Sequence, residues 1–206
     1  MSQEIKQINK PKLLIGEGKD EIRFFQSFLK YLNICDMMVE SYNGKDNLYS
    51  YLKTLVLRPN FSQLVSIGIT RDADNKPIDD LFKSICSALK RANLSNPNNY
   101  NLSKSSKGTP KINIFILPDN QNSGMLETLC LKSLKNDISM NCVDKYFDCI
   151  RQKSDIFPKN IDKAKIHAWL ASREISDKRL AEASEVGYFD FNNSAFDNLK
   201  EFIISL

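Results

Sequence analysis

The chain has 206 residues, of which 42% are hydrophobic and 26% charged, and its formal net charge is +4. This composition is typical of a globular domain and excludes disorder, collagen and coiled coil as descriptions of the whole chain. Residues 1–12 are polar and lack a secretory signal, and no uncharged apolar stretch approaches the roughly 18 residues of a membrane span. We therefore expect a cytoplasmic protein with no membrane partner, whose modest charge permits an anionic partner without requiring one.

Short apolar runs alternate with amphipathic stretches along the first two thirds of the chain. In chain order, the predicted elements are a strand at 12–16, a helix at 19–32, a strand at 37–42, a helix from 48 that ends before Pro59, a strand at 64–70, a helix at 79–92, a strand at 112–117 and a helix after Gly124. Single helices separate these strands, and each strand is apolar on both faces. The pattern therefore predicts an α/β fold with a parallel sheet of about four strands and helices on both sides.

After residue 137 only helical patterns follow, near 139–152, 160–173, 177–186 and 194–206. We accordingly divide the chain into an N-terminal tail (1–11), an α/β domain (12–136) and a helical extension (137–206) that packs on it. Residues 93–111 form a long loop that contains no acidic residue and three lysines, Lys104, Lys107 and Lys111. This loop is either a solvated connection or a basic arm that contacts a phosphate backbone.

Histidine and cysteine usage restricts the chemistry. The single histidine, His167, excludes H-E-x-x-H zinc proteases and clustered histidine metal sites. Five cysteines are present, none in C-x-x-C spacing, and each has a directly adjacent apolar residue: Cys35, Cys86, Cys130, Cys142 and Cys149. We interpret the cysteines as small buried hydrophobic residues rather than as a zinc or redox site. His167 and Trp169 are likewise interpreted as packing residues.

Acidic residues follow several of the predicted strands. Glu17 follows the first, Asp72 and Asp74 follow the third, Asp119 follows the fourth, and Glu127 starts the next helix. Because the carboxyl ends of parallel strands share one edge of a sheet, we expect these carboxylates to converge there. Each motif alone has an ordinary structural explanation, since D-x-D after a strand is commonly a turn or a helix cap. Several hard oxygen ligands together favour Mg²⁺ or Mn²⁺ over zinc or copper.

Other phosphate and D-x-D chemistries fit less well. Gly16 and Gly18 lack the third glycine of G-x-G-x-x-G, and the chain has no P-loop motif. A haloacid-dehalogenase-type phosphatase requires its aspartate after the first strand, whereas D-x-D here follows the third. A metal-dependent glycosyltransferase would explain D-x-D but not E-G-x-x-D after the first strand.

The combination of Glu17-Gly18-Lys19-Asp20 with Asp72-Ala73-Asp74 resembles the Toprim domain of topoisomerases, bacterial primases, small nucleases and OLD-type nucleases. The resemblance covers about residues 12–135. Glu127, in Gly124-Met125-Leu126-Glu127, is similar to the further acidic residue of OLD-type Toprim domains. The segments RDADN, FILPDN, GMLE and KIHAWLASR resemble an uncharacterised prokaryotic family of Toprim-like proteins of about this length.

This resemblance implies a Toprim-like (Rossmann-like) fold and Mg²⁺- or Mn²⁺-dependent phosphoryl transfer on nucleic acid, as in a nuclease or nicking enzyme. Glu17 would be a metal ligand or the general acid/base, and Asp72 and Asp74 would hold the ion. Asp20 and Glu127 would complete a second metal position, as in OLD-type sites.

OLD-type sites also use a lysine outside the core motifs. Lys165 is our candidate for it, with a solvated helix face as the alternative. The predicted nucleic-acid contacts are Arg71 and the loop lysines Lys104, Lys107 and Lys111.

The chain also departs from the resembled proteins. It lacks the topoisomerase tyrosine domain, the primase accessory domains and the ATPase domain of OLD nucleases. A separately encoded ATPase partner is therefore conceivable, and a homodimer is compatible with the sequence. The alternative function is a non-catalytic Toprim-like module that binds nucleic acid or a partner ATPase.

Overall fold

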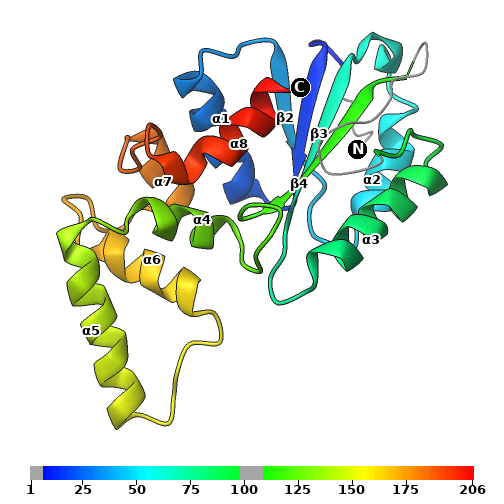
Figure 1. Cartoon of the computed structure of the whole chain (residues 1–206). Coiled ribbons are helices and arrows are strands. Elements are labelled where there is room, and N and C mark those ends of the chain that lie inside the picture. The colour runs from blue at the N-terminus through cyan, green and yellow to red at the C-terminus, as the bar shows by residue number, and fades with distance from the viewer. Residues whose placement is uncertain (1–6, 98–108) are drawn as a thin grey trace, which may run out of the picture.

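The computed structural model describes residues 7–97 and 109–206. Its centre is a four-stranded, all-parallel sheet with the strand order β2-β1-β3-β4 (Figure 1). Strand β1 (Lys12–Gly16) pairs with β2 (Met37–Ser41) and with β3 (Ser66–Asp72), and β3 pairs with β4 (Lys111–Leu117). The four predicted strands and their parallel arrangement are confirmed.

Helices cover both faces of the sheet. Because successive strand residues point to opposite faces, Leu14 joins one core, which contains α1 (Lys19–Tyr31), while Leu13 joins the other. The second core contains α2 (Leu48–Leu55) and α3 (Ile78–Arg91), which lie together beside the sheet in Figure 1. A single-turn 3₁₀ helix, Phe61–Gln63, precedes β3. The fold class predicted from the sequence is therefore correct.

Helix α4 (Leu126–Ser133) follows β4 and belongs to the predicted α/β domain. The C-terminal part after it is helical, as predicted, with α5 (Ile138–Lys153), α6 (Ile161–Ala171), α7 (Leu180–Glu185), a 3₁₀ turn (Ser194–Phe196) and α8 (Asp197–Ile204). Helix α8 returns to the sheet, where the Ser66 hydroxyl donates a hydrogen bond to the Leu206 carbonyl at 2.5 Å. A Cβ at Gly68 would lie 2.6 Å from the Leu206 side chain, so only glycine permits this close approach.

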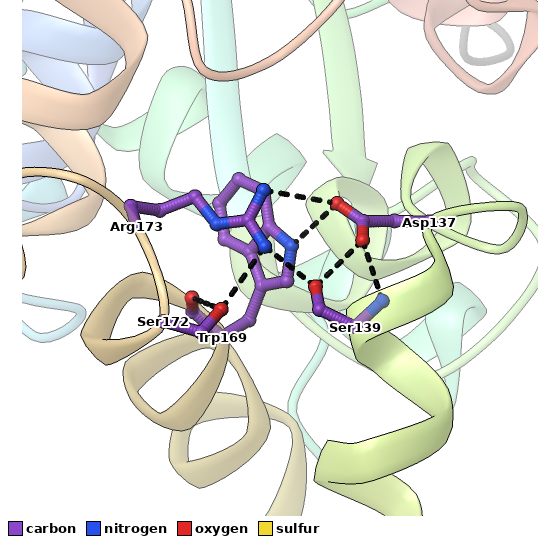
Figure 2. A network of polar contacts seen from close by, with 5 residues as sticks. All are labelled: Asp137, Ser139, Trp169, Ser172 and Arg173. Atoms are coloured by element: carbon purple, nitrogen blue, oxygen red, sulfur yellow. Dashed lines mark hydrogen bonds and ion pairs between the residues drawn. The ribbon is translucent and has the colours of Figure 1, made fainter.

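Helices α5 and α6 project from the sheet as an arm (Figure 1) and are joined by a polar network (Figure 2). Asp137 caps α5 by accepting a hydrogen bond from the Ser139 N–H, and it also accepts one from the Trp169 indole at 2.8 Å. Arg173 lies over the Trp169 ring and contacts both Asp137 and Ser139. This network fixes the end of α6 against the start of α5.

The cysteine interpretation is wrong for most of the five residues. Only Cys130 is buried; Cys35, Cys142 and Cys149 are exposed, and Cys86 is half-buried. An apolar neighbour in sequence does not bury a helical residue, since adjacent positions of a helix face different directions. In residues 7–97 and 109–206, no helix combines the length and apolar character needed to cross a membrane.

Candidate active site

The turn between β1 and α1 is built around a buried carboxylate. Glu21, in the first turn of α1, accepts hydrogen bonds from the backbone N–H groups of Glu17 (2.6 Å) and Gly18 (3.3 Å), and from the Thr70 hydroxyl. A Cβ at Gly16 would lie 2.8 Å from the Glu21 carboxyl carbon, so the absence of a side chain there makes room for Glu21. The turn that carries Glu17 is thereby held from inside the fold.

The end of β3 positions a second set of acidic residues. The Asp72 carboxylate accepts a hydrogen bond from the backbone N–H of Leu126 at 3.1 Å and so satisfies a donor at the start of α4. Two residues later, Asp74 has a left-handed backbone (φ 51°) and forms an antiparallel bridge with Gly124. These contacts join the D-x-D segment to the loop before α4 and set the position of Glu127 in the first turn of that helix.

Acidic and basic side chains line one cavity of about 550 Å³, here called the acidic cavity, at the C-terminal edge of the sheet. Its carboxylates come from three segments of the chain: Glu17, Asp20, Glu21, Asp72 and Glu127. Its basic and imidazole side chains come from α1, α6 and the start of α7: Lys19, Lys163, His167 and Arg179. Of the carboxylates predicted to converge, Glu17, Asp72 and Glu127 line this cavity together, whereas Asp74 and Asp119 do not; Asp20, the further predicted ligand, also lines it.

Burial and mutual repulsion raise the pKa values of these carboxyls. Burial raises the pKa of Asp72 to about 8, with further contributions from the charges of Glu21, Glu127 and Glu17. Burial also raises the pKa of Glu21 to about 7, although its three hydrogen-bond donors oppose the shift. The pKa of Glu17 is raised by burial and by Asp74, while Arg71 lowers it. The cavity therefore retains protons near neutral pH unless a cation replaces them.

The lysine of α6 that lines the acidic cavity is Lys163, whereas the predicted Lys165 does not line it. The Lys163 ammonium lies 3.9 Å from a Glu127 carboxylate oxygen. Lys165 is absent from the cavity lining and forms an ion pair of 2.6 Å with Asp144 on α5. Residues 163, 166 and 167 share one helix face because they are separated by three or four positions, whereas residue 165 points elsewhere.

Two other predicted carboxylates, Asp74 and Asp119, lie outside the acidic cavity. Asp74 lines a neighbouring cavity of about 410 Å³, although its charge still acts on Glu17. Asp119 accepts hydrogen bonds from the N–H groups of Gln121 and Asn122, pairs with Lys132, and is therefore a turn residue.

Of the lysines predicted to contact nucleic acid, the structure places one, Lys111. Lys111 begins β4, whereas the acidic cavity lies at the edge of the sheet where β4 ends with Leu117. The six residues between them correspond to about 20 Å along the strand, so Lys111 does not lie beside the acidic cavity. Lys104 and Lys107 lie outside the described residues.

The acidic cavity offers carboxylate oxygens, which are the ligands that a hard divalent cation prefers. Among the residues that the structure describes, however, no three His, Cys, Asp or Glu side chains are grouped closely enough to hold an ion as they stand. Binding would therefore require rotation of carboxylate side chains toward one another. Burial and the neighbouring carboxylates raise the pKa of Asp72, so added positive charge beside it would be stabilising.

Sequence reasoning overlooked Glu21, the most deeply buried carboxylate of the site. An available signal was its position three residues after Gly18, the N-cap of α1, where a Glu side chain often bonds back to the N-cap N–H. The neighbouring Asp20, which the sequence analysis selected instead, is exposed at the cavity.

The fold and the site define an α/β protein that gathers carboxylates at the C-terminal edge of a parallel sheet, beneath helices of its C-terminal part. The chain belongs to the family described as "Protein of unknown function (DUF3226)", which matches residues 11–206. This confirms the predicted membership of an uncharacterised family, whereas the relation to Toprim proteins stays a prediction.

A solved structure, the crystal structure of hypothetical protein PH0156 from Pyrococcus horikoshii OT3, is similar in fold. Its TM-score is 0.63 at 14% sequence identity, and the match covers 95% of this chain and 93% of that chain. A comparison with curated proteins gives no match.

Proposed function

We propose that this protein is a Mg²⁺- or Mn²⁺-dependent phosphoryl-transfer enzyme that acts on nucleic acid in the cytoplasm, as a nuclease or nicking enzyme related to Toprim and OLD-type proteins. The observation that carries the proposal is the shared cavity of Glu17, Asp72 and Glu127, which three separate segments of the chain deliver. Crowded carboxylates repel one another, so the folded state becomes more stable when a cation or a proton neutralises their charge.

The proposed ligands are Asp72, Glu127 and Glu17, with Asp20 at the exposed side of the cavity. A divalent ion bound there would lower the pKa of a water molecule and neutralise negative charge on a phosphate. Asp74, in the neighbouring cavity, would act on this site through its charge and through its bridge to Gly124.

The remaining residues support this chemistry in distinct ways. The Glu17 carboxylate is the proposed proton acceptor, because its pKa is raised by burial and it lies in an open cavity. Lys163 and Arg179 line the same cavity and supply donors for phosphate oxygens. Glu21 and Thr70 act as positioning residues that hold the backbone of Glu17.

The test is cleavage of labelled single-stranded, duplex and supercoiled DNA and of RNA, with Mg²⁺, Mn²⁺ or EDTA. Glu17→Gln should abolish turnover and leave nucleic-acid binding largely intact, because the amide keeps the shape but loses the proton-accepting and charged oxygens. Glu201→Gln, an exposed change on α8, is the matched control and should cleave like the wild type. Equal background cleavage by wild type and Glu17→Gln on every substrate would refute the enzymatic proposal.

The second candidate function is a non-catalytic module that binds nucleic acid or a separately encoded ATPase. The observation that favours it is the lack, within the described parts of the chain, of any three acidic or histidine side chains grouped to hold an ion. It predicts nucleic-acid binding in EDTA that metal does not change, and no turnover with or without the partner.

A further inference from the structure

A second polar cavity, of about 290 Å³, lies on the opposite side of β3 from Asp72 and is here called the basic pocket. Residues of α2, α3, β3 and the turn before α2 line it, and seven of them present polar or aromatic side chains: Lys45, Asp46, Tyr49, Arg71, Ser84, Ser87 and Arg91. Three cationic side chains face the pocket, whereas its lining contains a single carboxylate, Asp46. The basic pocket is therefore suited to an anion.

Arg71 is the strongest indication of a ligand. It precedes Asp72 in β3, and strand alternation directs it toward the basic pocket while Asp72 points to the acidic cavity. Arg71 is only 7% exposed. Over residues 7–97 and 109–206, no side-chain hydrogen bond or salt bridge engages its guanidinium group. Its charge acts on Glu17, and none of its guanidinium nitrogens is both fully buried and unpaired, so the group can reach the pocket. An anion there would supply the hydrogen-bond acceptor that Arg71 lacks among the described residues.

The other donors are placed to complete such a site. The Arg91 guanidinium lies 3.8 Å from the centre of the Tyr49 ring, a stacking contact that leaves its N–H edges free for an acceptor. Ser84 and Ser87 add hydroxyl donors from α3, and α2 begins at the pocket with Leu48, so its positive end favours an anion there.

The basic pocket is coupled to Glu17. Burial raises the pKa of Glu17 and the nearby Lys45 opposes this shift, while the Gly44 N–H donates a hydrogen bond to the Glu17 carbonyl oxygen at 2.9 Å. The turn that carries Lys45 is thus attached to Glu17, which lines the acidic cavity. A strand that entered the acidic cavity could continue past this turn with a neighbouring phosphate in the basic pocket.

We propose that the basic pocket binds a phosphate group of the nucleic-acid strand that occupies the acidic cavity, with Arg71, Arg91 and Lys45 as its ligands. The identity of the strand rests on the proposed function, whereas the preference for phosphate rests on the pocket itself. The pocket is a positioning site, since it contacts a phosphate adjacent to the one at which Glu17 acts.

The experiment measures binding of a labelled single-stranded oligonucleotide of about 12 nucleotides in EDTA, where metal-dependent cleavage is absent. Arg91→Gln and Lys45→Gln should each weaken binding about tenfold and reduce the slope of log affinity against log salt by about 0.7. Lys90→Gln, the adjacent exposed cation on α3 outside the pocket, should change neither quantity. Arg71→Gln should weaken binding at least as much, with its melting temperature measured in parallel because this side chain is buried.

The outcomes separate this proposal from the proposed function. Unchanged binding in a Lys45→Gln, Arg91→Gln double variant, or an equal loss in Lys90→Gln, would overturn the phosphate site. Competition by inorganic phosphate alone, with oligonucleotide binding unaffected by the variants, would show that the pocket serves a free phosphate and would overturn the strand assignment. If Glu17→Gln binds the oligonucleotide normally while the wild type never cleaves it, the phosphate site stands and the enzymatic proposal fails.

Discussion

Replacing Asp72 with asparagine should stabilise the metal-free protein at neutral and alkaline pH. Asp72 is half-buried beside three other carboxyls, and its pKa is raised from an ordinary value of 3.8 to about 8. Between these two pKa values the folded state holds a proton on Asp72 that the unfolded state releases. The contribution of Asp72 to the stability of the wild type is therefore greatest below pH 4, where both states are protonated, and is lost as the pH rises through 8. Asparagine resembles the protonated acid, and its amide oxygen can still accept the hydrogen bond from the Leu126 N–H.

The size of the effect follows from the pKa shift. Between the ordinary pKa of 3.8 and pH 7, keeping Asp72 protonated in the folded state costs about 1.4 kcal/mol of unfolding free energy for each pH unit. Asparagine removes this cost, so Asp72→Asn should be more stable than wild type at pH 7 by at most about 4 kcal/mol. For a chain of this length, each kcal/mol shifts the melting temperature by about 2–4 °C. The difference between Asp72→Asn and wild type should vanish near pH 4 and reach its maximum above pH 8.

The assay is thermal and urea unfolding in EDTA from pH 5 to pH 9. Asp119→Asn is the matched control, because Asp119 is perturbed in the opposite direction. Burial would raise its pKa, but the Lys132 ammonium and the hydrogen bonds from Asn122 and Gln121 lower it to about 2. Asp119→Asn should therefore destabilise the protein at pH 7. An Asp72→Asn variant that is less stable than wild type at pH 8 would refute the account of a repelling, buried cluster.

Three further predictions concern the ion, the Glu17 turn and the helical arm. Mn²⁺ at about 100 times its dissociation constant should stabilise the wild type by about 2.7 kcal/mol in a melting assay, and a variant combining Asp72→Asn with Asp74→Asn should lose this response; an equal response in both would contradict the metal site. Gly16→Ala should cost about 1–3 kcal/mol in urea unfolding, because its Cβ would lie 2.8 Å from the Glu21 carboxyl carbon, and unchanged stability would show that Glu21 does not need that space. Asp137→Ala should lower the free energy of unfolding by about 2–3 kcal/mol, because α5 loses its cap and the indole N–H of Trp169 loses its acceptor. The fluorescence of Trp169, the single tryptophan, reports the unfolding, and an unfolding transition like that of the wild type would contradict this role of Asp137.

The sheet and most helices could be predicted because their signals are local. The run KLLIG at 12–16 and the run INIFIL at 112–117 are apolar on both faces, as buried parallel strands are. The convergence of Glu17 with Asp72 followed from the shared edge of parallel strands. The strand order β2-β1-β3-β4, in contrast, depends on where the chain crosses after α2, which no single segment encodes.

The parts of the site that the sequence analysis missed depend on contacts between distant segments. Glu21 is buried because Gly16 leaves room for it and Thr70, on another strand, donates to it. Lys163 rather than Lys165 lines the acidic cavity because the packing of α6 decides which face is turned toward α4. Helical periodicity places the two lysines on different faces, but it does not say which face meets the carboxylates.

The central claim is that the acidic cavity binds a divalent cation. The most direct measurement is a crystal of the full chain soaked in Mn²⁺, with anomalous density sought at the C-terminal edge of the sheet. The account predicts a peak within coordination distance of carboxylate oxygens of Asp72 and of Glu17 or Glu127, at about 2.0–2.3 Å, and its loss in crystals of Asp72→Asn. A clean map with no Mn²⁺ peak among these carboxylates, in crystals whose cavity is open to solvent, would contradict it.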